Sequence, residues 1–281
     1  TSNNKYANAP PRMSDGRHFT DYRPNCFLNT KIQIENSVPN SYEMRLFLTR
    51  NAKNLIELNK KNSFIFESVE KGIIKGQSDL VVLSNTPVSV SESVAQVLEF
   101  KASSWSDREY PNSLLGTIAL IRQTIMDAEW YHKARAVAKK FPTDNEPVKY
   151  NASLETLEKF RANRLPMLFM TNHEHTAIRA LNICDEFNLN PWLLGSGFEY
   201  RRLDELEKLN PFIILPLDFP AKPRVTDAFT ALQYDTEQLK HWDLAPDNIF
   251  KIQDKGLYFS LSSHGLKKKS QFRINLQRII D

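Results

Sequence analysis

The stretch PMLFMTNHEHTAIRAL, residues 166–181, decides the fold class of this chain. Its apolar run has the length of a strand and ends at Thr171, and a helical pattern of apolar residues starts shortly afterwards. The run shows no polar alternation, so both faces of the strand are expected to be buried. A buried strand that leads directly into a helix is typical of a parallel sheet with crossover helices.

The same order of strand and helix recurs to the end of the chain. Three further short apolar runs lie at residues 191–195, 211–217 and 257–263. Helices are predicted after each run, at 174–187, 199–209, 229–241, 246–255 and 267–280. Upstream, the sequence predicts a short strand at 79–84 and helices at 113–141 and 151–163. The predicted fold class is α/β, with a parallel sheet covered by helices.

The first 61 residues differ in character from the rest. Residues 1–24 contain three prolines and no apolar periodicity, which predicts an extended arm. Residues 41–61 predict one amphipathic helix, which either lies on its own domain or docks on a partner chain. The side chains expected to bind a partner are Arg17, Phe19, Tyr22, Arg23 and Phe47. We therefore predict an arm plus helix at 1–61 and an α/β domain at 62–281.

Composition argues against several classes of partner. The net charge is +4 and the basic residues are scattered, apart from Lys267–Lys269, so nucleic-acid binding is not expected. No apolar run approaches about 18 residues, so no membrane span is predicted. No signal peptide is recognisable, and the localisation stays undetermined.

Three segments of the chain resemble a known enzyme family. They are YPNSLLGTIALIRQTIMDAEWY (110–131), the stretch from IRALNICDEF to NPFIILPL (178–217), and LYFSLSSHGLKKKSQFRINL (257–276). From about residue 72 to residue 281, the chain is similar to the imidazolonepropionase-like group of the amidohydrolase superfamily. The resemblance implies a (β/α)₈ barrel in which one or two divalent metals activate water.

The catalytic residues that the resemblance implies are not all present. Nothing before Gly72 matches the family's first His-x-His, and Met170 stands where a metal-binding His would end a strand. His264 falls near the position of the late catalytic Asp. A thioether is a poor ligand for hard or borderline cations, so no cofactor is expected, the alternative being Zn²⁺ or another divalent metal. Asn172 and His264 are the remaining catalytic candidates.

His173 and His175 are the candidate metal ligands. If the strand extends through residue 175, the two imidazoles point to the same side and face one ion. If Asn172 caps a helix instead, the two side chains diverge by about 200° in its first turn and do not chelate. The helical pattern that follows favours the second geometry.

Too few strands are recognisable to close a barrel. Eight βα units normally need about 250 residues, and the first 61 residues of this chain are assigned elsewhere. The expected fold is therefore a partial (β/α)₈-barrel-like sheet with covering helices, whose edges a partner or the arm would cover.

A second resemblance concerns residues 13–61. The strings MSDGRHFTDYRPNCFLN and NSYEMRLFLTRNAKNLIE resemble segments of minor virion proteins of large DNA viruses. This resemblance implies assembly with other protein chains, up to a virus capsid. The leading hypothesis is a non-catalytic amidohydrolase-like domain that acts through assembly with partner chains. The alternatives are a portion of a metal-dependent hydrolase of amide-like bonds and a minor capsid component anchored by its arm.

Overall fold

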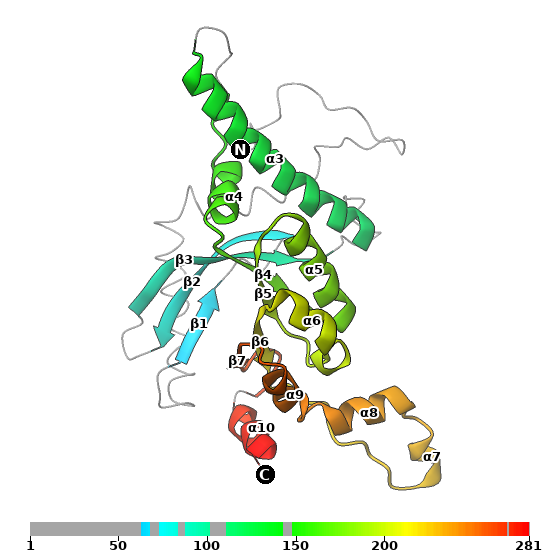
Figure 1. Ribbon diagram of the computed structural model, residues 1–281. Helices are drawn as coiled ribbons and strands as arrows, with labels where there is room; N and C mark the ends of the chain where they lie inside the picture. Colours follow the sequence, from blue (N-terminus) through cyan, green and yellow to red (C-terminus); the bar gives the residue numbers. More distant parts are fainter. Residues whose placement is uncertain are drawn as a thin grey trace. The chain divides into compact units, whose positions relative to one another are not determined.

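The structure is a computed structural model, and it describes residues 63–67, 73–83, 88–101, 111–142, 148–268 and 270–280 (Figure 1). The predicted partner-binding residues Arg17, Phe19, Tyr22, Arg23 and Phe47 lie outside these ranges, as do the arm and the amphipathic helix. Those assignments, and the boundary at residues 61 and 62, therefore stay predictions. The described residues group into two compact units, and the boundary runs through β4 (Pro166–Met170).

The first unit contains an antiparallel sheet of three strands. The strands are β1 (Ser63–Glu67), β2 (Ile74–Leu83) and β3 (Val88–Glu99), paired in that order. The predicted strand at 79–84 is the end of the longer β2, and the sequence analysis missed β1 and β3. The register between β2 and β3 shifts at bulges, and Gly76 adopts a positive φ of 88° beside the first of them.

Two helices complete the first unit. They are α3 (Leu114–Lys140) and α4 (Ala152–Ala162), which pack against each other. Ser113 caps α3 by accepting a hydrogen bond from the backbone N–H of Gly116, and Asn151 caps α4 in the same way. The predicted helices at 113–141 and 151–163 are confirmed to within one residue at each end.

The second unit contains parallel strands in the order β4, β5 (Asn190–Leu194), β6 (Phe212–Pro216) and β7 (Phe259–Ser262). β6 pairs in parallel with both β5 and β7. Ile213, Ile214 and Leu215 follow one another in β6 and are all buried, so both faces of this strand are covered. The predicted parallel strands are confirmed, with ends that differ by one or two residues.

The helices of the second unit follow the strands as predicted, with two breaks, and the helix predicted at 267–280 begins four residues later, at Gln271. In the described part of this unit they are α5 (Glu174–Glu186), η2 (Glu199–Arg201), α6 (Leu203–Leu209), α7 (Ala228–Ala231), α8 (Thr236–Leu244), α9 (Asn248–Asp254) and α10 (Gln271–Ile280). The helix predicted at 199–209 breaks at Arg202, and the one predicted at 229–241 divides into α7 and α8. Asp227 and Asp235 each close a capping box, so both short helices begin at a defined residue.

None of the described helices is both long and apolar enough to cross a membrane.

Candidate functional site

The polar side chains of interest follow the carboxyl ends of the parallel strands. The backbone N–H of Thr171 donates to Leu194, that of Gly195 donates to Ile214, and that of Leu217 donates to Ser262. These hydrogen bonds align the four strand ends in the second unit. Active sites of parallel α/β proteins form at this edge, so the loops that leave it are where chemistry is expected.

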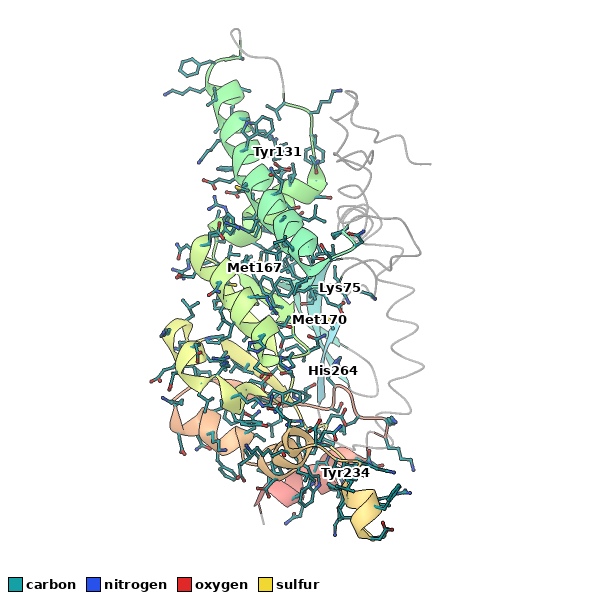
Figure 2. All side chains as sticks on the ribbon, turned by 90° about the vertical axis from the view of Figure 1, so that its right-hand side faces the viewer. Lys75, Tyr131, Met167, Met170, Tyr234 and His264 are labelled. Atoms are coloured by element: carbon teal, nitrogen blue, oxygen red, sulfur yellow. The ribbon has the colours of Figure 1, made fainter. Side chains whose placement is uncertain are left out.

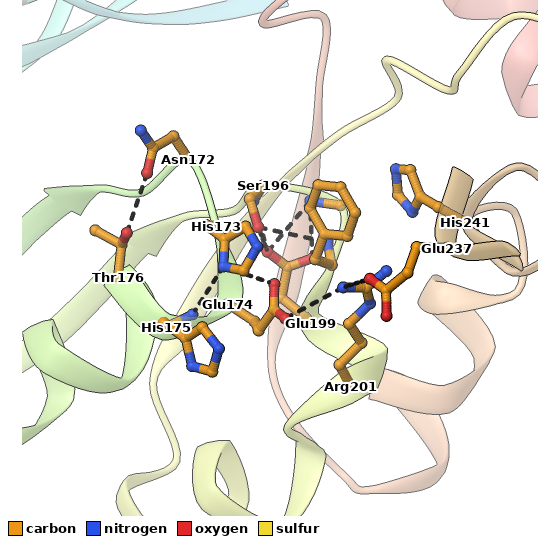
Figure 3. Close-up of polar contacts among 12 residues, drawn as sticks. Asn172, His173, Glu174, His175, Thr176, Ser196, Glu199, Arg201, Glu237 and His241 are labelled. Atoms are coloured by element: carbon orange, nitrogen blue, oxygen red, sulfur yellow. Dashed lines mark hydrogen bonds and ion pairs between the residues drawn. The ribbon is translucent and has the colours of Figure 1, made fainter. Parts of the chain in front are cut away.

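Glu199 is the most completely bonded of these side chains. It is buried, and its carboxylate accepts hydrogen bonds from the backbone N–H groups of Ser196 (2.6 Å) and Gly197 (3.0 Å) (Figure 3). The Ser196 hydroxyl donates at 3.2 Å and the Asn248 amide at 2.8 Å. Asn248 in turn accepts from the backbone N–H of Tyr200. The carboxylate therefore ties the loop after β5 to α9, which is a structural role.

Gly195 is required by the position of this carboxylate. A Cβ atom added at residue 195 would lie 2.8 Å from Oε1 of Glu199 and 3.3 Å from the carbonyl oxygen of Ile214. Neither distance permits ordinary van der Waals contact. In the GSGFE stretch, the missing side chain of Gly195 thus leaves room for the buried carboxylate of Glu199.

Glu174 begins α5 and is the second buried carboxylate of the site. Its Oε1 lies 3.3 Å from Nη1 of Arg201, which also pairs with Glu237 at 3.2 Å (Figure 3). The guanidinium of Arg201 lies over the rings of Phe198 and Tyr200, at 4.9 and 5.7 Å from their centroids. Arg201 therefore links α5, η2 and α8 through one side chain.

His173, Glu174 and His175 bring three possible ligands together. One nitrogen or carboxylate oxygen from each lies within 4.8 Å of the others. Nδ1 of His173 lies 2.9 Å from Oε2 of Glu174, and the two imidazole centroids are 5.2 Å apart. The helix begins at Glu174, as predicted, but the expectation that the two histidines diverge is wrong. His173 precedes the first helical turn, so its side chain is free to turn back over His175.

A stack of rings continues from these histidines. His173 faces Phe198 at 5.6 Å, Phe198 faces His241 at 3.8 Å, and His241 faces Tyr200 at 6.1 Å between centroids. Burial lowers the pKa of His241, and the positive charge of Arg201 lowers it further, while Glu174 acts in the opposite direction. The sequence analysis missed Phe198, Tyr200 and His241, because nothing in their spacing marks a contact between residues about forty positions apart.

The other predicted site residues are not among these grouped side chains. Asn172 is exposed, and its side-chain oxygen accepts from the Thr176 hydroxyl at 3.0 Å. His264 follows β7 and is exposed, and its backbone N–H donates to Ser262 (Figure 2). Among the described residues, His264 does not join the group of possible metal ligands.

Two sets of residues are candidates to bind the metal that the family resemblance implies. At the position the resemblance indicates, Met170 ends β4 with a thioether, and Glu199 is saturated by its structural hydrogen bonds. Those residues do not fit a hard or borderline cation. The donors of His173, Glu174 and His175 do fit one, because imidazole nitrogen and carboxylate oxygen are ordinary zinc ligands.

An open cavity of about 350 Å³ lies beside the buried carboxylate of Glu174. Its lining combines both signs of charge with one aromatic ring and one apolar side chain: Glu174, Tyr200, Arg201, Arg202, Glu237, Lys240 and Leu244.

Comparison with known proteins supports the fold. An amidohydrolase from Thermotoga maritima MSB8 matches this chain with a TM-score of 0.59 and 16% identity. The fold of this chain is amidohydrolase-like. The match covers 78% of this chain and 55% of that one, so the chain spans about half the length of the structure that it matches. At this identity the likeness shows the fold alone.

The other comparisons add nothing to this assignment. No protein-family model matches the chain, and no curated protein matches it. The resemblance of residues 13–61 to virion proteins has no support from these comparisons, and it lies outside the described residues.

Proposed function

We propose that this chain is a non-catalytic amidohydrolase-like domain that acts through assembly with partner chains. The observation that carries the proposal is the exposed apolar surface of residues 225–239 in the second unit. Phe229 is 78% exposed, Leu232 83% and Val225 56%. Apolar side chains that gather on one exposed segment are typical of a surface that binds another protein.

The form of this segment supports a binding role. α7 and α8 extend away from the strands of their unit, and α8 buries none of its residues completely (Figure 1). Both helices nevertheless begin at capping boxes, so the apolar side chains are held on ordered turns. Preordered apolar side chains lose little conformational entropy when a partner covers them.

The residues at the strand ends support the part of the proposal that the domain is non-catalytic. The carboxylate of Glu199 has all of its acceptor capacity directed at Ser196, Gly197 and Asn248. Met170 supplies no ligand that would activate water. Under the proposal, the arm residues Arg17, Phe19, Tyr22, Arg23 and Phe47 add a second contact region for the same partners.

The experiment compares partner capture by three forms of the whole chain. The double variant Phe229→Ser with Leu232→Ser removes the two most exposed apolar side chains at α7 and its C-cap, and Leu115→Ser is its matched control, since Leu115 is 78% exposed in the first unit. We expect crosslinking in the source cells to join the wild type and the control to the same partner, and the double variant to lose that partner. Equal capture by all three forms would contradict the proposed surface.

The same preparations test the second candidate function, a portion of a metal-dependent hydrolase of amide-like bonds. The cluster of His173, Glu174 and His175 at the strand ends is the observation that favours it. Hydrolysis of amide and cyclic amide substrates is measured with and without added Zn²⁺ and Mn²⁺. Turnover that the Glu174→Gln variant lacks would replace the leading proposal with this one.

A further inference from the structure

We propose that His173, Glu174 and His175 bind one borderline divalent cation of the Zn²⁺ class at the start of α5. The site differs from the one that the family resemblance implies, because that resemblance places its ligand at Met170, inside the strand. It is also independent of catalysis, since a bound cation activates water only when an open coordination position faces a substrate.

The separation of the donor atoms fits a shared ion. Two donors bonded to one Zn²⁺ at about 2.0 to 2.1 Å lie about 2.8 to 3.4 Å apart for bond angles of 90° to 109°. Nδ1 of His173 and Oε2 of Glu174 are 2.9 Å apart. The nearest donor of His175 lies within 4.8 Å of both, and His175 is exposed, so a rotation of its side chain closes the remaining distance.

The carboxylate oxygen at the centre of the site depends on the imidazole of His173 for a partner. Among the residues that the structure describes, buried Oε2 of Glu174 pairs with Nδ1 of His173 alone, whereas Oε1 pairs with Arg201. The side chain of Glu174 is only 6% exposed, so water does not solvate this oxygen freely. When the facing Nδ1 carries no proton, the buried oxygen lacks a donor, and a metal bond would satisfy it.

The hydrogen bonding of His173 adds a second argument. Its Nδ1 lies 3.4 Å from the backbone nitrogen of His175, which donates to it, and 2.9 Å from Oε2 of Glu174. In the tautomer that accepts the His175 N–H, the Nδ1 lone pair and the carboxylate oxygen converge, and a cation bound between them would satisfy both.

Two features of the surroundings limit the affinity. The N-terminus of α5 carries a partial positive charge, and Arg201 places a full one beside Glu174. Both repel a cation, so micromolar rather than nanomolar binding is expected. The exposed imidazole of His175 leaves the site open to exchange with solvent.

The test titrates the metal-free whole chain with ZnCl₂ in a calorimeter and with CoCl₂ in an absorption spectrometer. We expect one ion per chain and the visible bands of a low-coordinate Co²⁺ site. His175→Ala is expected to weaken binding about tenfold or more without affecting the fold, because this side chain is exposed. His132→Ala and His264→Ala are the matched controls, since both imidazoles are exposed and lie outside the cluster, and they should bind as the wild type does.

A second variant tests the carboxylate ligand. Glu174→Gln removes the charge and keeps the shape, and thermal melting establishes that it folds. No saturable binding, or binding that His175→Ala and Glu174→Gln leave unchanged, would overturn the site. Zinc binding without hydrolysis leaves this inference and the proposed function both standing, whereas zinc-dependent hydrolysis overturns only the proposed function.

Discussion

At the scale of single residues, two buried carboxylates at the strand ends have opposite environments. Glu199 has donors for both oxygens, from the backbone of its own loop and from Asn248. Glu174 has the guanidinium of Arg201 beside one oxygen and the imidazole of His173 beside the other. The first environment favours a fixed structural group, and the second favours a ligand. The sequence alone did not predict the environment of either carboxylate, because both environments depend on tertiary contacts.

Replacing Glu199 is expected to destabilise the second unit. In Glu199→Gln, an amide group faces the backbone N–H groups of Ser196 and Gly197, so at least one buried donor loses its acceptor. The expected loss is about 2–4 kcal/mol in the free energy of unfolding, measured by urea denaturation. Glu237→Gln is the matched control, since that side chain is 77% exposed, and it should cost less than about 1 kcal/mol. Equal losses in the two variants would show that burial of Glu199 contributes nothing.

The close approach of Gly195 to Glu199 gives a second prediction. Gly195→Ala places a Cβ atom 2.8 Å from Oε1 of Glu199, and we expect a loss of about 1–3 kcal/mol in unfolding free energy. Most of that loss should disappear in the background of Glu199→Ala, where the clashing atom is absent. Urea denaturation of the two single variants and the double variant measures this coupling. Additive losses would place the strain at the Ile214 carbonyl instead.

At the scale of helices and strands, the ring stack joins α8 to the loop after β5. Phe198 and Tyr200 both face His241, and Arg201 lies over both of their rings. The folded state favours the neutral imidazole of His241, because burial and Arg201 both disfavour its protonated form. The position of α8 is therefore coupled to one titration.

Acidification is expected to weaken the protein through His241. Its folded pKa is lowered below the ordinary value of 6.5, so the unfolded chain takes up a proton first as the pH falls. This contribution is fully present above the unfolded pKa and is lost as the pH falls through the folded pKa. Between about pH 7.5 and about pH 5, the wild type should lose more stability than His241→Phe, which keeps an aromatic ring in the stack. His132→Phe, on the surface of α3, serves as the control, and identical pH profiles for all forms would contradict the coupling.

The sequence predicted the elements whose signal is local. The parallel strands stand out as short uniform apolar runs, since both faces of β6 are buried. β3 carries an alternating apolar pattern in VSVSESVAQV, which would have identified this strand. The strand itself is irregular, since Ser93 adopts a positive φ of 55° and the register with β2 shifts at bulges. The apolar pattern did not predict the break at Arg202, where the backbone leaves the helical conformation, or the one before α8, which begins at the capping box of Asp235.

At the scale of the whole molecule, the chain has an amidohydrolase-like fold and spans 55% of the structure that it matches. Its described part divides into an antiparallel unit with two helices and a parallel unit with the candidate site. The candidate site lies wholly within the second unit, so its residues do not depend on the placement of the first.

Removing residues 1–40 tests whether the predicted arm is needed for folding or for assembly. The predicted arm has no apolar periodicity, so we expect the truncated chain to keep its circular dichroism spectrum and its melting temperature. We expect it to lose the partner that the full chain captures, because the predicted anchors Arg17, Phe19, Tyr22 and Arg23 are removed. A truncated chain that still captures the partner would exclude the arm from binding, and one that melts earlier would assign the arm to the fold.

The ring stack also makes the site observable by proton NMR. The imidazole of His241 lies 3.8 Å from the face of Phe198 with only 20° between the ring planes, so the phenyl ring current shields its protons strongly. His173 lies 5.6 Å from the same ring at 30° and is shielded less. The two histidines should therefore give separate resonances outside the crowded aromatic region. One spectrum would then follow the protonation of one imidazole and the metal binding of the other in the same sample.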